Sequence, residues 1–423
     1  MRMKLLRGAV VALAATVSLP ALSFAAVTAT EVVAHYVEIG HAKYEDALTT
    51  AKALDAAIDA LIATPSATTL EAARTAWLAA RNPYQETEAY RFGNAVVDAW
   101  EGKVNAWPLD EGLIDYVDPS YGTESDENAL YTANVIANPK ITVDGEAIDA
   151  TTITPELIAS LREAGGIEAN VTTGYHAIEF LLWGQDLNGT GPGAGNRPYT
   201  DYDTQACTNG NCDRRAAYLK SASTLLVGDL EEMVAAWAPE GEAAKAVLAD
   251  PKAGLSAMLT GMGSLSYGEL AGERMKLGLL LHDPEEEHDC FSDNTHNSHL
   301  HDQIGIETVY TGSYTRTDGT TLSGPSLSAL VAEKDKALDA ELTAKLEKTT
   351  AAMRAMVERA RTTEAYDQMI GEGNAEGNAI VQAAIDGLID QTKSVERVIS
   401  SLDLGTIELE GSDSLDNPDA VFQ

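Results

Sequence analysis

The chain has 423 residues, with 65 acidic and 29 basic side chains and a formal net charge of −36 at pH 7. A surface this acidic repels nucleic acid and anionic lipid, so the usual electrostatic mode of binding to either is excluded. It suits a cationic ligand, although most of the charge can be explained as a solvated surface. A chain of this length is sufficient for two domains and a large core.

Residues 1–25 read as a secretory signal peptide. Arg2, Lys4 and Arg7 precede an apolar run from residue 9 to 22, and Ser23-Phe24-Ala25 places small residues at both positions that a signal peptidase reads. We therefore predict cleavage after Ala25 and export of the remaining chain. The alternative, a membrane anchor, is disfavoured because the run is short and is interrupted by proline.

No later segment approaches about 18 continuous apolar residues, so we expect no transmembrane segment in the mature chain. Cys207 and Cys212 could close a small loop in an oxidising compartment. That pairing leaves Cys290 either buried or in competition for one of the other two. A zinc site at the Cys207–Cys212 spacing alone is a weak prediction, because the chain has no second close pair.

Helical periodicity dominates the first part of the mature chain. Apolar residues spaced by three, four or seven predict a helix over 31–63, which Pro65 ends. Thr68 or Thr69 is expected to cap a second helix that ends near Arg81, and a further helix is expected to restart at Pro83 and reach residue 100. Short strands are predicted only at 140–143 and 148–153, around a turn.

A Gly/Pro-rich segment over 188–212, which contains the two close cysteines, predicts a linker between an N-terminal domain at 26–187 and a C-terminal domain at 213–404. Helices are expected over 214–237, 252–281, 326–361 and 375–402, with a polar His-rich loop over 282–302. The acidic tail at 405–423 is expected to be loosely held. Ile-Glu followed by glycine five residues later occurs near residue 178 and near residue 306, which either a duplication or chance explains.

The most informative segment runs from Thr173, a reasonable helix cap, to Gly184. His176 and Glu179 are three residues apart, so on a helix they share one face. An imidazole and a carboxylate on one face can both bind iron or zinc. Glu179 stands among apolar residues, so it needs a partner, which could be a cation, an arginine or a charged His176. A core in which protein groups satisfy both residues is the alternative to a ligand site.

Gly174, His176 and Glu179 resemble the G-x-H-x-x-E signature of the imelysin family. Other segments agree in order along most of the mature chain: WLAAR at 77–81 with Tyr84, Glu88, Arg91 and Phe92, WPLD at 107–110, ELAGERM at 269–275, and DPEEEH at 283–288 followed by CFSDNTH at 290–296. The last two resemble the longer, iron-regulated branch of the family.

This resemblance implies an all-α protein of two related helical-bundle domains, located in the periplasm or on the outer membrane and tied to iron uptake. It implies that His176 and Glu179 bind an iron or zinc ion between the domains, with haem or another chelate as an alternative cargo and an envelope iron transporter or receptor as partner. Cofactor-binding candidates in matching segments are Arg81, Glu88, Asp110 and Arg274. For each of these an interhelical salt bridge or a helix cap is the alternative.

Some members of the family are classed as metallopeptidases, which would make Glu179 a catalytic base. A zinc peptidase usually has two histidines, a third ligand and an open position. H-E-x-x-H is absent from the chain, and the inverted motif would need a histidine where Phe180 stands. Cys290 lacks the positive surroundings that activate a thiol.

Five of the eight histidines fall within the predicted loop at 282–302, together with many acidic residues. The loop could scavenge metal or supply helper ligands. The alternative, which the lack of a defined ligand spacing favours, is a solvated acidic loop.

Three hypotheses follow for the function. The leading one is a binding protein that captures iron, free or as a chelate, and helps to deliver it inward. The second is a metallopeptidase that uses Glu179, and the third is an envelope scaffold in which His176 and Glu179 only brace the core.

Overall fold

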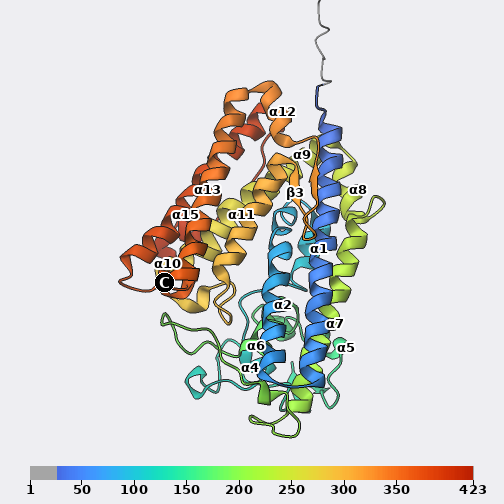
Figure 1. The fold of residues 1–423 in the computed structure, drawn as a ribbon, viewed down its shortest axis with the longest axis vertical. Helices are drawn as coiled ribbons and strands as arrows, with labels where there is room; N and C mark the ends of the chain where they lie inside the picture. The colour runs from blue at the N-terminus through green and yellow to red at the C-terminus, as the bar shows by residue number, and fades with distance from the viewer. Residues whose placement is uncertain (1–25, 423) are drawn as a thin grey trace, which may run out of the picture.

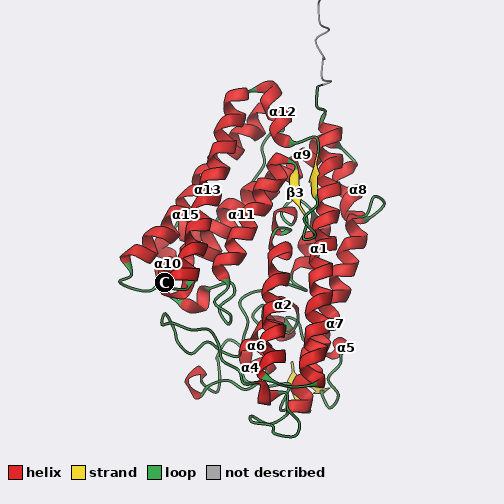
Figure 2. Cartoon of the chain, viewed as in Figure 1, coloured by secondary structure: helices red, strands yellow, loops and turns green. Residues whose placement is uncertain are grey.

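A computed structural model describes residues 26–422 of the chain, so the predicted signal peptide at 1–25 lies outside the described residues. The described chain is built almost entirely from helices, with two small two-stranded sheets (Figure 2). This confirms the prediction of an all-α fold. No helix within the described range is long and apolar enough to cross a bilayer.

Long helices stand in two groups side by side (Figure 1). The first group is centred on α1, which packs against α2 and α7, and the second on α13, which packs against α11 and α15. The bounds of these helices are α1 Ala29–Ala63, α2 Ala67–Gln85, α7 Cys212–Trp237, α11 Thr295–Thr311, α13 Lys336–Thr362 and α15 Ala375–Ser401.

Shorter helices complete the two groups. They are α3 Ala95–Glu101, α4 Glu111–Ile114, α5 Pro155–Ser160, α6 Gly174–Trp183, α8 Glu242–Leu248, α9 Pro251–Ser264, α10 Leu277–Leu281, α12 Leu327–Lys334, α14 Tyr366–Ile370 and α16 Asp413–Asp416. Single turns of 3₁₀ helix are η1 Glu88–Tyr90, η2 Pro119–Tyr121, η3 Ala164–Gly166, η4 Tyr199–Asp201, η6 Pro284–Glu286 and η7 Pro418–Phe422, whereas η5 Leu265–Lys276 is a π-helix.

Most predicted helices are confirmed, but the helix predicted over 83–100 is wrong, because turns and η1 separate α2 from α3, and the helix predicted over 326–361 is divided at Asp335 into α12 and α13. Two further differences concern α2. Its cap is Ser66, whose hydroxyl accepts from the Thr69 N–H, so the expected cap at Thr68 or Thr69 is wrong. Helix α2 also continues through Pro83 to Gln85 instead of restarting there. Pro83 lies in the last turn, and the helix ends two residues after it.

The two sheets are antiparallel hairpins. Strand β1 Lys140–Val143 confirms the first predicted strand, whereas β2 Glu146–Asp149 begins and ends earlier than the predicted strand at 148–153. Strands β3 Ser313–Thr315 and β4 Thr321–Ser323 were not predicted. At three residues each they are too short for a periodic signal, although Asp318-Gly319 between them is a turn pair that could have indicated a hairpin.

The sequence left the cysteine pairing open, and the segment at 188–212 carries a disulfide between Cys207 and Cys212, with Cys290 buried as a free thiol. Helix α7 follows this segment yet packs on α1, α5 and α6, which precede it. One apolar core runs through both groups of helices. The division into two domains at this segment stays a prediction.

The His-rich segment is not a loop over its whole length. Helix α11 begins at Thr295, so His296, His299 and His301 lie on a helix. The tail is also held more firmly than expected: the Glu410 N–H donates to Ser264 at 3.0 Å, and Ser412 and Ser414 are buried. Both differences have the same cause, because the polar side chains of these segments find buried partners that their composition does not reveal.

Candidate metal centre

Helix α6 is fixed in place at its first residue. Gly174 has a φ of +83°, and a Cβ there would lie 2.3 Å from the carbonyl oxygen of Val104, so only glycine fits. The next N–H, that of Tyr175, donates to the same carbonyl at 2.8 Å. Thr173 occupies the cap position, but its hydroxyl donates to Lys103 and not to the helix. All ten residues of α6 are buried, so its polar side chains point into the protein.

His176 and Glu179 do share one face of α6, as predicted. Nδ1 of His176 lies 3.3 Å from Oε2 of Glu179, while Oε1 of Glu179 accepts from the backbone N–H of Ser292 at 3.0 Å and from its hydroxyl at 2.6 Å. Burial, and then the Asp289 carboxylate, raise the pKa of Glu179 well above its ordinary value. Burial, and then the Arg81 guanidinium, lower the pKa of His176. A neutral imidazole is the form that binds a metal.

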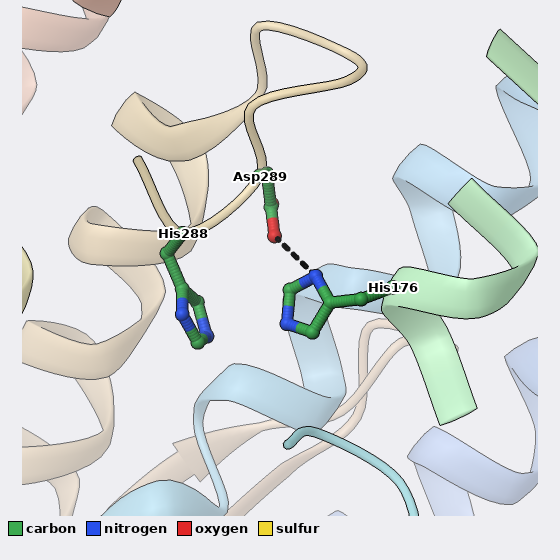
Figure 3. A group of neighbouring side chains, drawn as sticks. All are labelled: His176, His288 and Asp289. Carbon is green, nitrogen blue, oxygen red and sulfur yellow. Dashed lines mark ion pairs between the residues drawn. The ribbon is translucent and has the colours of Figure 1, made fainter. Parts of the chain in front are cut away.

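The segment between η6 and α11 brings two more donors to this face. His288 and Asp289 are 3% and 0% exposed, so the interpretation of this segment as solvated is wrong for both. His176, His288 and Asp289 each offer one possible ligand atom, and these three atoms lie within 4.8 Å of one another. The three residues are therefore a candidate set of metal ligands. Figure 3 shows the two imidazoles side by side and Asp289 approaching His176 from the neighbouring loop.

Two atoms of this set have no hydrogen-bond partner anywhere in the described chain. They are Nε2 of His176 and Nε2 of His288, both fully buried. Buried polar atoms are nearly always paired, so two orphaned nitrogens in rings whose centroids lie 4.8 Å apart call for a ligand. Two imidazoles and a carboxylate are a common donor set for iron and zinc.

Arg81, predicted from its matching segment, is part of the same site. Its guanidinium is fully buried and donates to Oδ1 of Asp289 at 2.7 Å and to the amide oxygen of Asn105 at 2.7 Å. Burial by itself would raise the pKa of Asp289, but Arg81 and His176 outweigh it and lower the value. Asp289 is therefore held as a carboxylate that faces His176.

Arg274 and Glu88, two other predicted residues, form an adjoining ion-pair network. Arg274 contacts Glu88 at 2.8 Å, Glu269 at 2.8 Å and Asp302 at 3.1 Å. It is carried by η5, and π-helical turns frequently occur at functional sites. Glu88 and Arg274 therefore fit the alternative interpretation, an interhelical salt bridge. In the described chain, neither makes a hydrogen bond or an ion pair with the donor set.

Asp110 lies outside this arrangement. Its carboxylate accepts from Asn128, its N–H donates to Ala169, and no contact joins it to the donor set within the described residues. Trp107, three residues earlier in the same turn, was not singled out from sequence, yet its ring lies 4.9 Å from that of His176 and 6.5 Å from that of His288. The W-P-L-D turn therefore contributes its tryptophan to the site, and its aspartate contacts other groups.

The comparisons with known proteins agree with this architecture. The family model described as Imelysin matches residues 40–395. The chain belongs to the imelysin family. A segment of 61 residues is 39% identical to iron-regulated protein A of Synechococcus elongatus, a match that spans 14% of this chain and only 17% of that relative.

Two solved structures share the fold. One is described as an iron-regulated protein A precursor from Parabacteroides distasonis, with a TM-score of 0.64 and 20% identity over 90% of this chain and 98% of the other. The second is an imelysin-like protein from Psychrobacter arcticum, with a TM-score of 0.57 and 18% identity over 90% of this chain and all of the other. At these identities the likeness concerns the fold alone.

Proposed function

We propose that this imelysin binds a first-row transition-metal ion, iron foremost, through His176, His288 and Asp289. The observations that carry the proposal are the two orphaned, fully buried imidazole nitrogens of His176 and His288, and the ionised Asp289, whose Oδ1 lies 4.0 Å from Nδ1 of His176. Two histidines and one carboxylate with open positions suit Fe(II), and zinc accepts the same donors. The similarity to two proteins described as iron-regulated favours iron over zinc.

The balance of buried charge supports a cationic ligand. Around the donor set, three arginines lie among six carboxyl groups, all of them buried except the partly exposed Arg91 and Glu269: Arg81, Arg91 and Arg274 against Glu88, Glu101, Glu179, Glu269, Asp289 and Asp302. Buried carboxylates without counter-charges are costly, so each surplus group must hold a proton or a cation. A divalent ion would compensate two of them at once.

Glu179 was predicted as a ligand, and we retain it as part of the proposed site. Because Ser292 holds one of its oxygens and the other lies 3.3 Å from Nδ1 of His176, we assign it the role of orienting that imidazole. Carboxylates commonly fix the orientation of a metal-binding histidine in this way. Glu179→Gln should therefore weaken metal binding by about 10–100-fold without abolishing it.

The physiological role that fits this centre is iron acquisition outside the cytoplasm. The predicted signal peptide and the word precursor in the name of the Parabacteroides neighbour support export to the periplasm or the outer membrane. We propose that the loaded protein passes its ion to an envelope transporter or receptor.

A peptidase reading is less well supported by the geometry. A catalytic base must reach a water or a substrate proton, but Glu179 is fully buried and both its oxygens contact protein groups. Cleavage of a peptide library that is lost on addition of chelator and in Glu179→Gln would establish the enzyme and replace the binding proposal.

Metal analysis of the purified mature chain tests the proposal. The protein is loaded anaerobically with Fe(II), and separately with Zn(II) or Mn(II), then desalted and measured by elemental mass spectrometry. We expect about one tightly held ion per chain, loss of that ion in His288→Ala and in Asp289→Asn, and retention in His41→Ala, a partly exposed histidine of α1. Circular dichroism confirms the fold of each variant. A wild-type chain that retains no supplied ion, or a His288→Ala variant that retains it fully, would refute the proposal.

A further inference from the structure

A cavity of about 480 Å³ adjoins the candidate metal centre. Its walls come from four parts of the chain: Arg91 after η1 together with α3, the turn at 105–108, the segment at 163–168, and η5 with α10 and the segment at 286–288. His288 lines it directly, and so do Trp107 and Asn105. The cavity therefore connects His288, one proposed ligand, to a space outside the donor set.

The lining is strongly acidic. Six of its residues are glutamates and two are arginines: Glu101, Glu163, Glu168, Glu269, Glu273 and Glu286, with Arg91 and Arg274. Both arginines are already paired, Arg274 with Glu88, Glu269 and Asp302, and Arg91 with Asp98, Glu101 and Glu269. The remaining four glutamates make no ion pair within the described chain. The field inside the cavity is consequently that of uncompensated negative charge.

Exposure falls from one end of the cavity to the other. Glu163, Glu168 and Glu273 are exposed, whereas Asn105 and His288 are 2% and 3% exposed. Two donors at the buried end lack any partner in the described chain, Nδ2 of Asn105 and Nε2 of His288. A polar space that runs from an acidic, solvent-facing mouth to an unpaired imidazole has the layout of an access route for a cation.

We propose that this cavity is the route by which metal reaches His288, and that the cargo travels as the positively charged aqua ion and not as an anionic chelate. This inference rests on the proposed metal centre and adds the chemical form of the cargo and its path. Clefts lined by one sign of charge raise the local concentration of the opposite ion and its association rate by about 10–10³-fold, an effect that salt screens. The same field repels ferric citrate and the carboxylate-bearing haem.

The chain offers its own kinetic reporter. Trp107 lines the cavity and lies next to the rings of His176 and His288, so a paramagnetic ion bound there should quench its fluorescence. Association of Co(II) with the metal-free mature chain can then be followed by stopped flow at about 10 mM and about 500 mM ionic strength, conditions between which the Debye length falls several-fold.

The decisive comparison uses two charge-matched triple variants. In one, Glu163, Glu168 and Glu273 at the mouth are each replaced by Gln. In the control, Glu347, Glu358 and Glu372, exposed residues that do not line the cavity, are replaced likewise. At low salt we expect the mouth variant to bind Co(II) about 5–10-fold more slowly than the control, with the difference lost at high salt. Both variants should hold the same amount of ion at equilibrium.

The outcomes separate this inference from the proposed function. If the wild type binds no ion, the metal centre itself fails. If it binds Co(II) but the mouth and control variants associate at equal rates at low salt, the metal centre stands and the access route is wrong. Binding of ferric citrate or haem to the wild type as tightly as Co(II) would overturn the cationic form of the cargo.

Discussion

At the scale of residues, Arg81 and Asp289 form a buried ion pair at the proposed metal site. Both side chains are fully buried, and the arginine has no carboxylate partner as close as Asp289, at 2.7 Å. Breaking a buried ion pair from one side leaves an uncompensated charge in a medium that cannot solvate it. The pair therefore positions a proposed metal ligand, and loss of either partner should destabilise the metal-free protein.

We expect Arg81→Met to lower the free energy of unfolding of the metal-free chain by about 3–5 kcal/mol. The matched control is Arg397→Met, which removes a solvent-exposed pair with Glu341 and should cost less than about 1 kcal/mol. Urea unfolding followed by circular dichroism measures both. Equal losses in the two variants would show that the buried pair contributes no more than a surface pair.

Asp367, which is not one of the proposed ligands, should make the free energy of unfolding depend on pH. It is 1% exposed, neither carboxylate oxygen has a hydrogen-bond partner in the described chain, and burial together with the nearby Asp186 raises its pKa to about 7. A carboxyl whose folded pKa lies above its unfolded value stabilises the fold when protonated, and that contribution is lost as the pH rises through the folded value.

The free energy of unfolding should accordingly fall between about pH 4, near the unfolded pKa, and about pH 7, the folded pKa, with Asp367 contributing a slope of at most about 1.4 kcal/mol per pH unit. Asp367→Asn should flatten the profile in that window, whereas Asp386→Asn, an exposed residue of α15, should leave it unchanged. Denaturant titrations in the presence of chelator at several pH values test this. A profile for Asp367→Asn as steep as that of the wild type would contradict it.

At the scale of elements, glycines of the π-helix η5 allow the C-terminal segment to pack closely against it. A Cβ on Gly272 would lie 2.2 Å from Cβ of Ser412, and one on Gly268 would lie 2.7 Å from the carbonyl oxygen of Glu410. Hydrogen bonds from Ser414 to the Gly272 carbonyl and from Tyr267 to Asp416 complete the contact. The tail thus covers the element that carries Arg274.

Gly272→Ala should displace this tail and destabilise the protein by about 1–3 kcal/mol, as overpacking of a close contact does. Gly228→Ala in α7 is the opposite case, because its Cβ would meet nothing, and it should stabilise by about 0.5–1 kcal/mol. Thermal unfolding compares the two, and limited proteolysis reports release of the tail. A protected tail and an unchanged melting temperature in Gly272→Ala would disprove the packing argument.

At the scale of the whole molecule, the proposed ligands connect distant parts of the chain. His176 is carried by α6, which packs on α2 and α7, whereas His288 and Asp289 immediately precede α11, which packs on α13. A bound ion would therefore bridge the two groups of helices seen in Figure 1. Binding to the folded state alone stabilises it according to the ratio of free ion to Kd.

Saturation with Fe(II) at about 100 times its Kd should raise the free energy of unfolding by about 2.7 kcal/mol. The increase should disappear in His288→Ala, which retains the fold but lacks a ligand. Anaerobic thermal unfolding with and without metal provides the measurement. Stabilisation of equal size in the variant would place the ion elsewhere.

Sequence by itself determined the class of fold and one half of the site. Helical periodicity and proline placement predicted most helices, and the spacing of His176 and Glu179 predicted their common face, because both properties depend on neighbours within a turn or two. The sequence left the pairing of the three cysteines open, and the structure joins Cys207 to Cys212.

Only the tertiary structure brought His288, Asp289 and Arg81 to His176. These contacts join residues far apart in the chain, and the local composition of the 282–302 segment is that of a solvated loop, so no pattern within it distinguished the buried donors from the partly exposed residues around them. Which carboxylates lie at the mouth of the acidic cavity and which face Arg91 or Arg274 depends likewise on how α3, η5 and the loops pack. The sequence specifies which side chains are present, but their burial and the electrostatic field around them depend on how the helices pack.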